Sequence, residues 1–168
     1  METQLQADVK EPSSAQLIWI VLLGLIVSGT LIQVKVAHTG IVETFLLYFL
    51  VLQVGVGGLF CFVGHYFVAD KVAKAIGWPA GNPFQTELGF ANLSLGVLGI
   101  LCIWLRGNFW IATGVVYSVF FFGGAWVHIN EEVLKKKNFS IAITGPVLYT
   151  DIIGPIAMIG LLIAYFWG

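Results

Sequence analysis

The chain consists of long apolar stretches separated by short polar segments. Five stretches come near the roughly 20 residues that a helix needs to cross a hydrocarbon core of about 30 Å. They cover residues 16–36, 42–67, 83–105, 108–133 and 146–166. The pattern predicts an all-α, polytopic membrane helix bundle of five transmembrane helices. We expect helices 2–5 to form a four-helix unit and helix 1 to pack on its side.

Small residues recur at helical spacing inside the spans and predict faces where backbones approach closely. In the third span this face contains Gln85, Gly89, Asn92, Gly96 and Gly99. The fourth span has the most regular face, with steps of three and four through Gly114, Tyr117, Phe121, Gly124, His128 and Glu131. The second half of the second span is rich in glycine as well. These faces are predicted to contact protein rather than lipid.

The stretch from Gly77 to Gly99 joins a polar turn to the third span. Asn82 and Pro83 are typical of a helix start, because an amide caps free N–H groups and proline has none to satisfy. The third helix is therefore predicted to begin near Pro83. Glu87 then falls in its first turns, where a negative charge suits the helix dipole.

Lysines and arginines divide unequally between the two ends of the predicted bundle. The end that holds the N-terminus carries Lys10, Lys71, Lys74, Lys135, Lys136 and Lys137, whereas the other carries Lys35 and Arg106. The positive-inside rule then predicts a cell (inner) membrane protein with a cytoplasmic N-terminus and an external C-terminus. The amphipathic segment around residues 69–76 is predicted to lie in the interface, anchored by Trp78.

Composition agrees with a membrane protein and limits its partners. The 168 residues are 58% hydrophobic and 10% charged, with a mean hydropathy of +0.92. We expect one integral-membrane domain over residues 1–168, with a cytoplasmic tail at 1–15 and no large soluble domain. The formal charge of −1 argues against nucleic acid. Cys61 and Cys102 are predicted near opposite ends of the bundle, too far apart for a disulfide.

Polar side chains collect at the predicted cytoplasmic ends of helices 2–5. A charge inside hydrocarbon costs about 2.5 to 3.5 kcal/mol on insertion scales, so several at one depth imply pairing, water or a bound ion. Pro155 cannot donate to the carbonyl of Asp151, which adds a free acceptor beside an acid. The expected cluster comprises His65, Asp70, Gln85, Glu87, Asn92, His128, Asn130, Glu131, Glu132 and Asp151.

Three interpretations of this cluster compete. It could be structural, with His65 and His128 bonded to Glu87 or Asp151 across helices. It could bind zinc or iron through His65, His128, Glu87 and Asp151, or a b-type haem through His65 and His128. It could exchange protons with a lipid-soluble substrate such as a quinone, or with a translocated ion, which would require a partner or an oligomer. The spacing of the residues leaves all three open.

Several motifs resemble a family of small prokaryotic membrane proteins catalogued only as a domain of unknown function. They are Gly64-His65, IGWPAGNPFQTELGFANLSLGVLG from Ile76 to Gly99, Phe109-Trp110, His128, and GPVLYTDI from Gly145 to Ile152. The resemblance runs from about Gly57 to the C-terminus and implies no established activity. The layout of helices 2–5 is also similar to DoxX-like proteins, some of which accompany quinone-linked sulfur oxidation.

The sequence favours a non-catalytic accessory subunit of a membrane complex, with a polar site on the cytoplasmic side. Its expected partners are the lipid bilayer and other membrane subunits or further copies of the chain. The alternatives are a metal- or haem-binding or quinone-linked redox component, and a small proton-coupled transporter acting as an oligomer. No nucleophile or nucleotide motif indicates an enzyme.

Overall fold

The computed structural model describes residues 14–75, 78–135 and 147–168. Within these ranges the structure contains helices and no strands, which confirms the all-α prediction. Five helical segments are long and apolar enough to cross a membrane: Gln16–Ala37, Ile41–Phe67, Phe84–Leu101, Asn108–Lys135 and Leu148–Phe166. The protein is therefore a multi-pass membrane protein. Lys10, Lys136, Lys137 and most of the predicted N-terminal tail lie outside the described residues.

Several spans are built from more than one helical element. The first is α1 (Ser14–Ala37), and the third is α5 (Phe84–Leu101). The second joins α2 (Ile41–Tyr48), the π-helix η1 (Phe49–Val56) and α3 (Gly57–Phe67). The fourth joins α6 (Asn108–His128) to the π-helix η2 (Ile129–Lys135). The fifth joins the π-helix η3 (Val147–Ile153) to α8 (Gly154–Phe166), and the short α4 (Ala69–Ala75) follows the second span.

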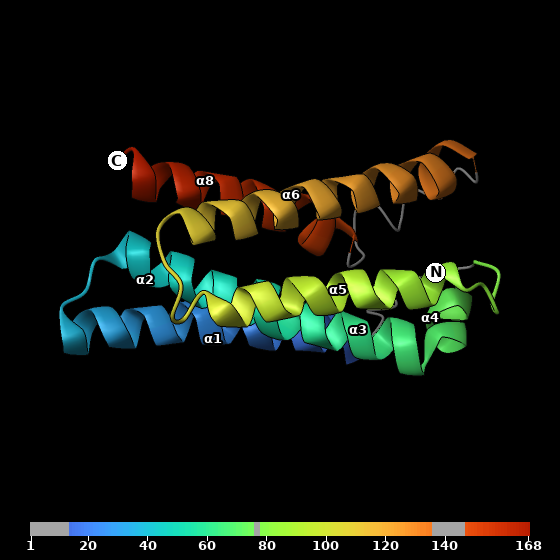
Figure 1. Ribbon diagram of the computed structural model, residues 1–168, viewed down its shortest axis with the longest axis horizontal. Coiled ribbons are helices and arrows are strands. Elements are labelled where there is room, and N and C mark those ends of the chain that lie inside the picture. The colour runs from blue at the N-terminus through green and yellow to red at the C-terminus, as the bar shows by residue number, and fades with distance from the viewer. Residues whose placement is uncertain (1–13, 76–77, 136–146) are drawn as a thin grey trace, which may run out of the picture.

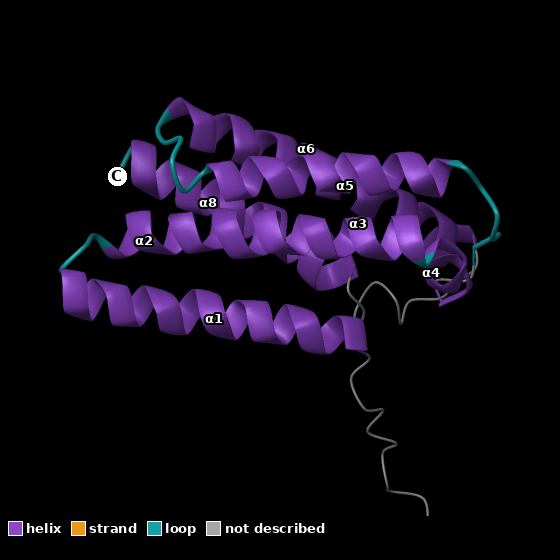
Figure 2. Cartoon of the chain, turned by 60° about the horizontal axis from the view of Figure 1, so that its bottom comes forward, coloured by secondary structure: helices purple, strands orange, loops and turns teal. Residues whose placement is uncertain are grey.

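Successive spans run in opposite directions, as Figure 1 shows. One end of the bundle, called here the α4 end, holds the end of α3, α4, the start of α5 and η2. The opposite end holds the start of α2, the start of α6 and the C-terminus. Helix α1 lies on one side of the other four spans, packed mainly against α2 and η1 (Figure 2). The predicted arrangement of helix 1 beside a four-helix unit is thus confirmed.

Glycine backbones hold the second span against the third. A methyl group added to Gly58 would come within 2.6 Å of the Gly96 backbone nitrogen and 2.8 Å of the Asn92 carbonyl oxygen. One added to Gly99 would collide with the backbone nitrogen of Gly55. Without hydrophobic attraction between helices in lipid, such close packing supplies much of the association. The predicted small-residue face of the third span is confirmed, with Gly89, Asn92, Gly96 and Gly99 all buried.

The start of α5 follows the predicted chemistry with a shift of one residue. The helix begins at Phe84, with Pro83 immediately before it. The Asn82 side-chain oxygen accepts a hydrogen bond from the Phe84 N–H at 2.9 Å. Asn82 therefore satisfies one of the free donors that every helix start leaves.

Trp110 closes the interior at the end opposite α4. It is completely buried, and its indole N–H donates to the Cys102 carbonyl oxygen at 2.9 Å. Arg106 lies over its ring, 5.3 Å from the centroid, and forms an ion pair with Glu43 at 2.7 Å. The Trp110 side chain thus links the start of α6 to the end of α5.

Replacing Trp110 with phenylalanine is expected to lower the free energy of unfolding by about 1 to 2 kcal/mol. The change keeps most of the apolar ring but leaves the buried Cys102 carbonyl without its donor. Titration with sodium dodecyl sulfate in mixed micelles, followed by circular dichroism, measures the change. Trp104→Phe is the matched control, because Trp104 lies at the same end and is 68% exposed. Equal effects of the two substitutions would contradict this role for the indole N–H.

Candidate functional site

An acid is buried within the fifth span. Asp151 belongs to η3 and is 7% exposed. The Thr150 hydroxyl donates to its Oδ1 at 2.5 Å. A methyl group on Gly124 of α6 would lie 3.4 Å from its Oδ2, so the glycine leaves space for the carboxyl group between the two helices. The fifth span therefore presents its carboxyl group to the fourth, rather than to lipid.

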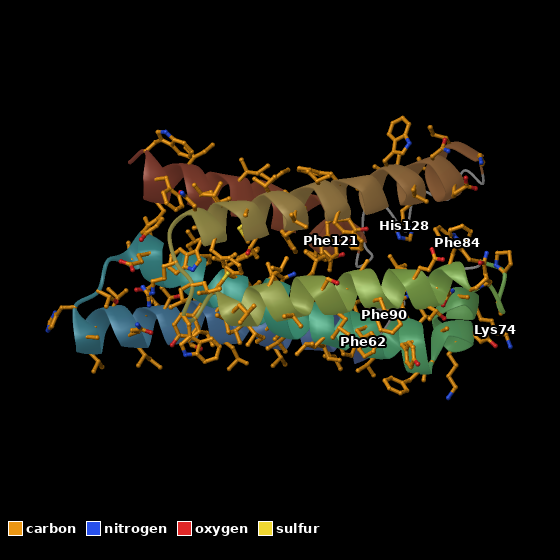
Figure 3. All side chains as sticks on the ribbon, in the orientation of Figure 1. Phe62, Lys74, Phe84, Phe90, Phe121 and His128 are labelled. Carbon is orange, nitrogen blue, oxygen red and sulfur yellow. The ribbon has the colours of Figure 1, made fainter. Side chains whose placement is uncertain are left out.

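His128 provides the partner of this acid. Its Nε2 lies 4.0 Å from Asp151 Oδ2, and the side chains of the two residues are 22% and 10% exposed. His128 ends α6 and projects from it toward the interior of the bundle (Figure 3). Of the residues expected in one polar cluster, the structure thus brings His128 and Asp151 next to each other.

Trp78 covers His128 from the loop that precedes α5. The two rings are stacked, with centroids 5.3 Å apart and an angle of 29° between their planes. The sequence suggested only a headgroup anchor at this position. A tryptophan after a polar interfacial helix carries no signal of its tertiary contact, so its place in the site could not be found from spacing. The stack restricts access to the imidazole.

The pair lies close to the boundary of the hydrocarbon core. Trp126, two residues before His128, is 71% exposed, and at the opposite end Trp104 is 68% exposed. Indole rings favour the two membrane interfaces. From Asn108 to Trp126 the helix rises about 27 Å at 1.5 Å per residue, close to the thickness of the core. His128 therefore lies near the membrane interface at the α4 end.

Two π-helical segments adjoin the site. Residues 147–153 form η3, which contains Asp151, and η2 begins directly after His128. In a π-helix each carbonyl accepts from the N–H five residues later. The Asp151 carbonyl therefore does not need the N–H of the residue four positions later, which is Pro155 and has none. The sequence predicts a free Asp151 carbonyl, and nothing in it signals the π geometry. Such segments are rare and are often found at functional sites.

His65 and Tyr117 extend the polar region around the pair. His65 on α3 lies close enough to His128 for electrostatic interaction, and its buried Nδ1 has no hydrogen-bond partner in the described part of the chain. Tyr117 lies deeper in the bundle and is completely buried. Its hydroxyl also has no hydrogen-bond partner of normal geometry among the described residues. The Gln53 side chain approaches that hydroxyl, and Asp151 and Cys61 lie within electrostatic reach of it. Gln53 was missed because a single amide in an apolar run gives no pattern.

The remaining predicted residues are engaged elsewhere or face outward. Asp70 Oδ1 accepts from the Gly81 N–H at 2.9 Å, and Glu131 pairs with Lys135 at 2.5 Å. Asn92 is buried and donates to the Leu88 carbonyl of its own helix at 2.8 Å. Glu87 is exposed. These residues share an end of the bundle without forming one cluster.

Gln85 differs from the rest because its buried Oε1 has no partner among the described residues. Asn130 is partly buried at the start of η2. Nothing is described for the side chain of Glu132.

The predicted metal set is not assembled in the structure. Within residues 14–75, 78–135 and 147–168, no group of three or more His, Cys, Asp or Glu residues is placed to hold a metal ion. His65, His128 and Asp151 come from three spans that meet, whereas Glu87 is exposed. Cys61 and Cys102 are free thiols, as their predicted separation requires.

A family model matches the chain from residue 14 to residue 167. The chain belongs to the family of unknown function DUF6790. The DUF6790 match includes α1, so the sequence expectation that the first helix lies outside the family is wrong. No curated protein and no solved structure matches the chain. Membership in DUF6790 does not indicate an activity, so the function has to be inferred from the chemistry of the site.

Proposed function

We propose that the protein is a non-catalytic component of the cell membrane whose His128–Asp151 site takes up and releases a proton. The observation that supports this most is the Asp151 carboxyl group, 7% exposed within a membrane span and 4.0 Å from an imidazole nitrogen. Ionisable groups at this depth are costly and are, by default, candidates for proton or ion handling. Histidine is the side chain whose charge changes most readily near neutral pH.

The surroundings of the pair support exchange with the α4 end of the bundle. The His128 side chain retains 22% exposure, while Asp151 is the more buried partner. A proton would reach the imidazole first and the carboxyl group second. His65 adds a second imidazole close enough to influence the first.

The protein acts in this proposal as an accessory subunit within a larger membrane assembly or as a homo-oligomer. Lys71, Lys74 and Lys135 lie at the α4 end, and Lys35 and Arg106 at the other. The positive-inside rule then supports a cytoplasmic α4 end and an external C-terminus. Proton uptake would occur from the cytoplasm.

A proton-coupled transporter acting as an oligomer is the second candidate function. The buried Tyr117 hydroxyl favours it, because it lies beside Gln53 and within electrostatic reach of Asp151 and Cys61, and so continues the polar region into the bundle. Quinone-linked chemistry and a b-type haem held by His65 and His128 remain predictions from the sequence.

The stacked indole of Trp78 provides a direct test of proton uptake. A protonated imidazole in contact with an indole quenches its fluorescence, so the Trp78 emission is expected to fall as the pH is lowered. The Trp78 component is the difference between the spectra of the native protein and Trp78→Phe, because the chain contains six tryptophans. His128→Gln should abolish the pH dependence, and Asp151→Asn should displace it.

The matched control is His38→Gln. His38 is exposed in the loop between α1 and α2, at the opposite end of the bundle, and should leave the titration unchanged. A Trp78 emission that stays constant between pH 5 and 8 would overturn the proposal.

A further inference from the structure

A cavity of about 450 Å³ opens at the α4 end, on a part of the surface separate from the His128–Asp151 site. It lies where the second span ends and the chain turns into the short helix α4. Its walls are Tyr66, Phe67, Val68, Ala69, Asp70 and Lys71. The cavity therefore joins the aromatic end of a span to a charged interfacial helix.

Aromatic side chains extend from this cavity along the outer surface of α3 and α5. The Tyr66 ring lies 4.9 Å from Phe67, 5.2 Å from Phe62 and 5.5 Å from Phe90, measured between centroids. Phe67 is 67% exposed and Phe90 52%. The four rings thus form one continuous aromatic surface, and Figure 3 shows two of them, Phe62 and Phe90, close together on α3 and α5.

One acid and two lysines lie beside the cavity, so their formal charges sum to +1. Asp70 faces the following loop and accepts from the Gly81 N–H at 2.9 Å. Lys71 lines the cavity and Lys74 follows it on the same helix. Neither lysine forms an ion pair with any residue that the structure describes. A cationic edge consequently adjoins the aromatic surface.

We propose that this cavity binds an anionic phospholipid of the surrounding bilayer, with its headgroup phosphate on Lys71 and Lys74 and an acyl chain along Phe67, Tyr66 and Phe90. The arrangement fits that ligand in two respects. Lysines close to the membrane surface attract anionic headgroups, and the adjacent rings offer apolar contact at the depth where the acyl chains begin. A soluble anion would use only the lysines.

Native mass spectrometry of the full chain in detergent tests the proposal, with phosphatidylglycerol or phosphatidylcholine added at equal concentration. Phosphatidylglycerol is expected to bind with at least roughly tenfold higher affinity. The double variant Lys71→Glu, Lys74→Glu should abolish this preference. Lys135→Glu is the matched control at the same end, because Lys135 is paired with Glu131. Equal binding of the two lipids by the native protein, or equal effects of the lysine variants, would overturn the site.

A second pair of variants distinguishes a defined lipid-binding site from nonspecific electrostatic attraction. Phe67→Ser should weaken phosphatidylglycerol binding by roughly fivefold or more, whereas Trp104→Ser, equally exposed at the opposite end, should not. Binding that depends on the lysines but not on Phe67, and disappears at high salt, would leave only surface attraction and refute the site. Loss of a dimer peak from the mass spectrum of the lysine variants would show that this surface binds a second copy of the chain rather than lipid. None of these results depends on proton uptake at His128.

Discussion

Replacing Asp151 with alanine is expected to lower the free energy of unfolding by about 1 to 3 kcal/mol, the cost of leaving a buried polar group without its hydrogen-bond partner. Two groups depend on this carboxyl. The Thr150 hydroxyl loses its acceptor, and His128 loses the acid 4.0 Å from its Nε2. Titration with sodium dodecyl sulfate in mixed micelles gives the stability of each variant.

The double variant His128→Leu, Asp151→Leu distinguishes a structural pair from a functional one. Apolar residues of similar size often replace a buried pair without loss of stability. The double variant is therefore expected to stay within about 1 kcal/mol of the native protein while losing the acid-dependent change in Trp78 fluorescence. Glu87→Ala is the control, because this carboxyl is exposed and should change stability by less than about 0.5 kcal/mol. A cost below 1 kcal/mol for Asp151→Ala would contradict the buried pair.

Gly58→Val is expected to lower the free energy of unfolding by more than about 3 kcal/mol, above the usual cost of overpacking. The added Cβ would lie 2.6 Å from the Gly96 nitrogen and 2.8 Å from both the Gly96 Cα and the Asn92 carbonyl oxygen. These are backbone atoms of α5, so no side-chain rotation can relieve the contact. The second and third spans would have to separate along much of their length.

Gly123→Val is the matched control for this substitution. Gly123 also lies in a membrane span, yet a Cβ there meets nothing within 4 Å. The same detergent titration should show a change of less than about 1 kcal/mol, mostly from helix propensity. A similar loss of stability for both variants would mean that glycine flexibility, rather than the close approach of α3 and α5, determines the effect.

Much of the fold could be predicted from local patterns in the sequence. The apolar stretches located all five spans to within a few residues, because a helix must cover a fixed hydrocarbon thickness. The spacing of Gly89, Asn92, Gly96 and Gly99 identified the buried face of α5. Alternating span direction also placed His65, His128 and Asp151 at one end. These conclusions depend on period, length and topology, which the order of residues contains.

The composition of the site was predicted less well. Asp70, Glu131 and Asn92 were expected in one cluster and instead bind Gly81, Lys135 and Leu88. Sharing an end of a bundle fixes the depth of a residue but not the direction in which its side chain points. That direction depends on the rotation of each helix about its own axis, and the π-helical segments η1, η2 and η3 change it locally.

The sequence by itself determined a multi-pass helical membrane protein, its span boundaries and its glycine-packed interface, since hydrophobic length and helical period are local properties. Only the tertiary structure decided that Asp151 meets His128 under the ring of Trp78, with Glu87 left outside. Those contacts join residues from a loop and two spans, and they depend on how far each helix is turned and shifted against its neighbours.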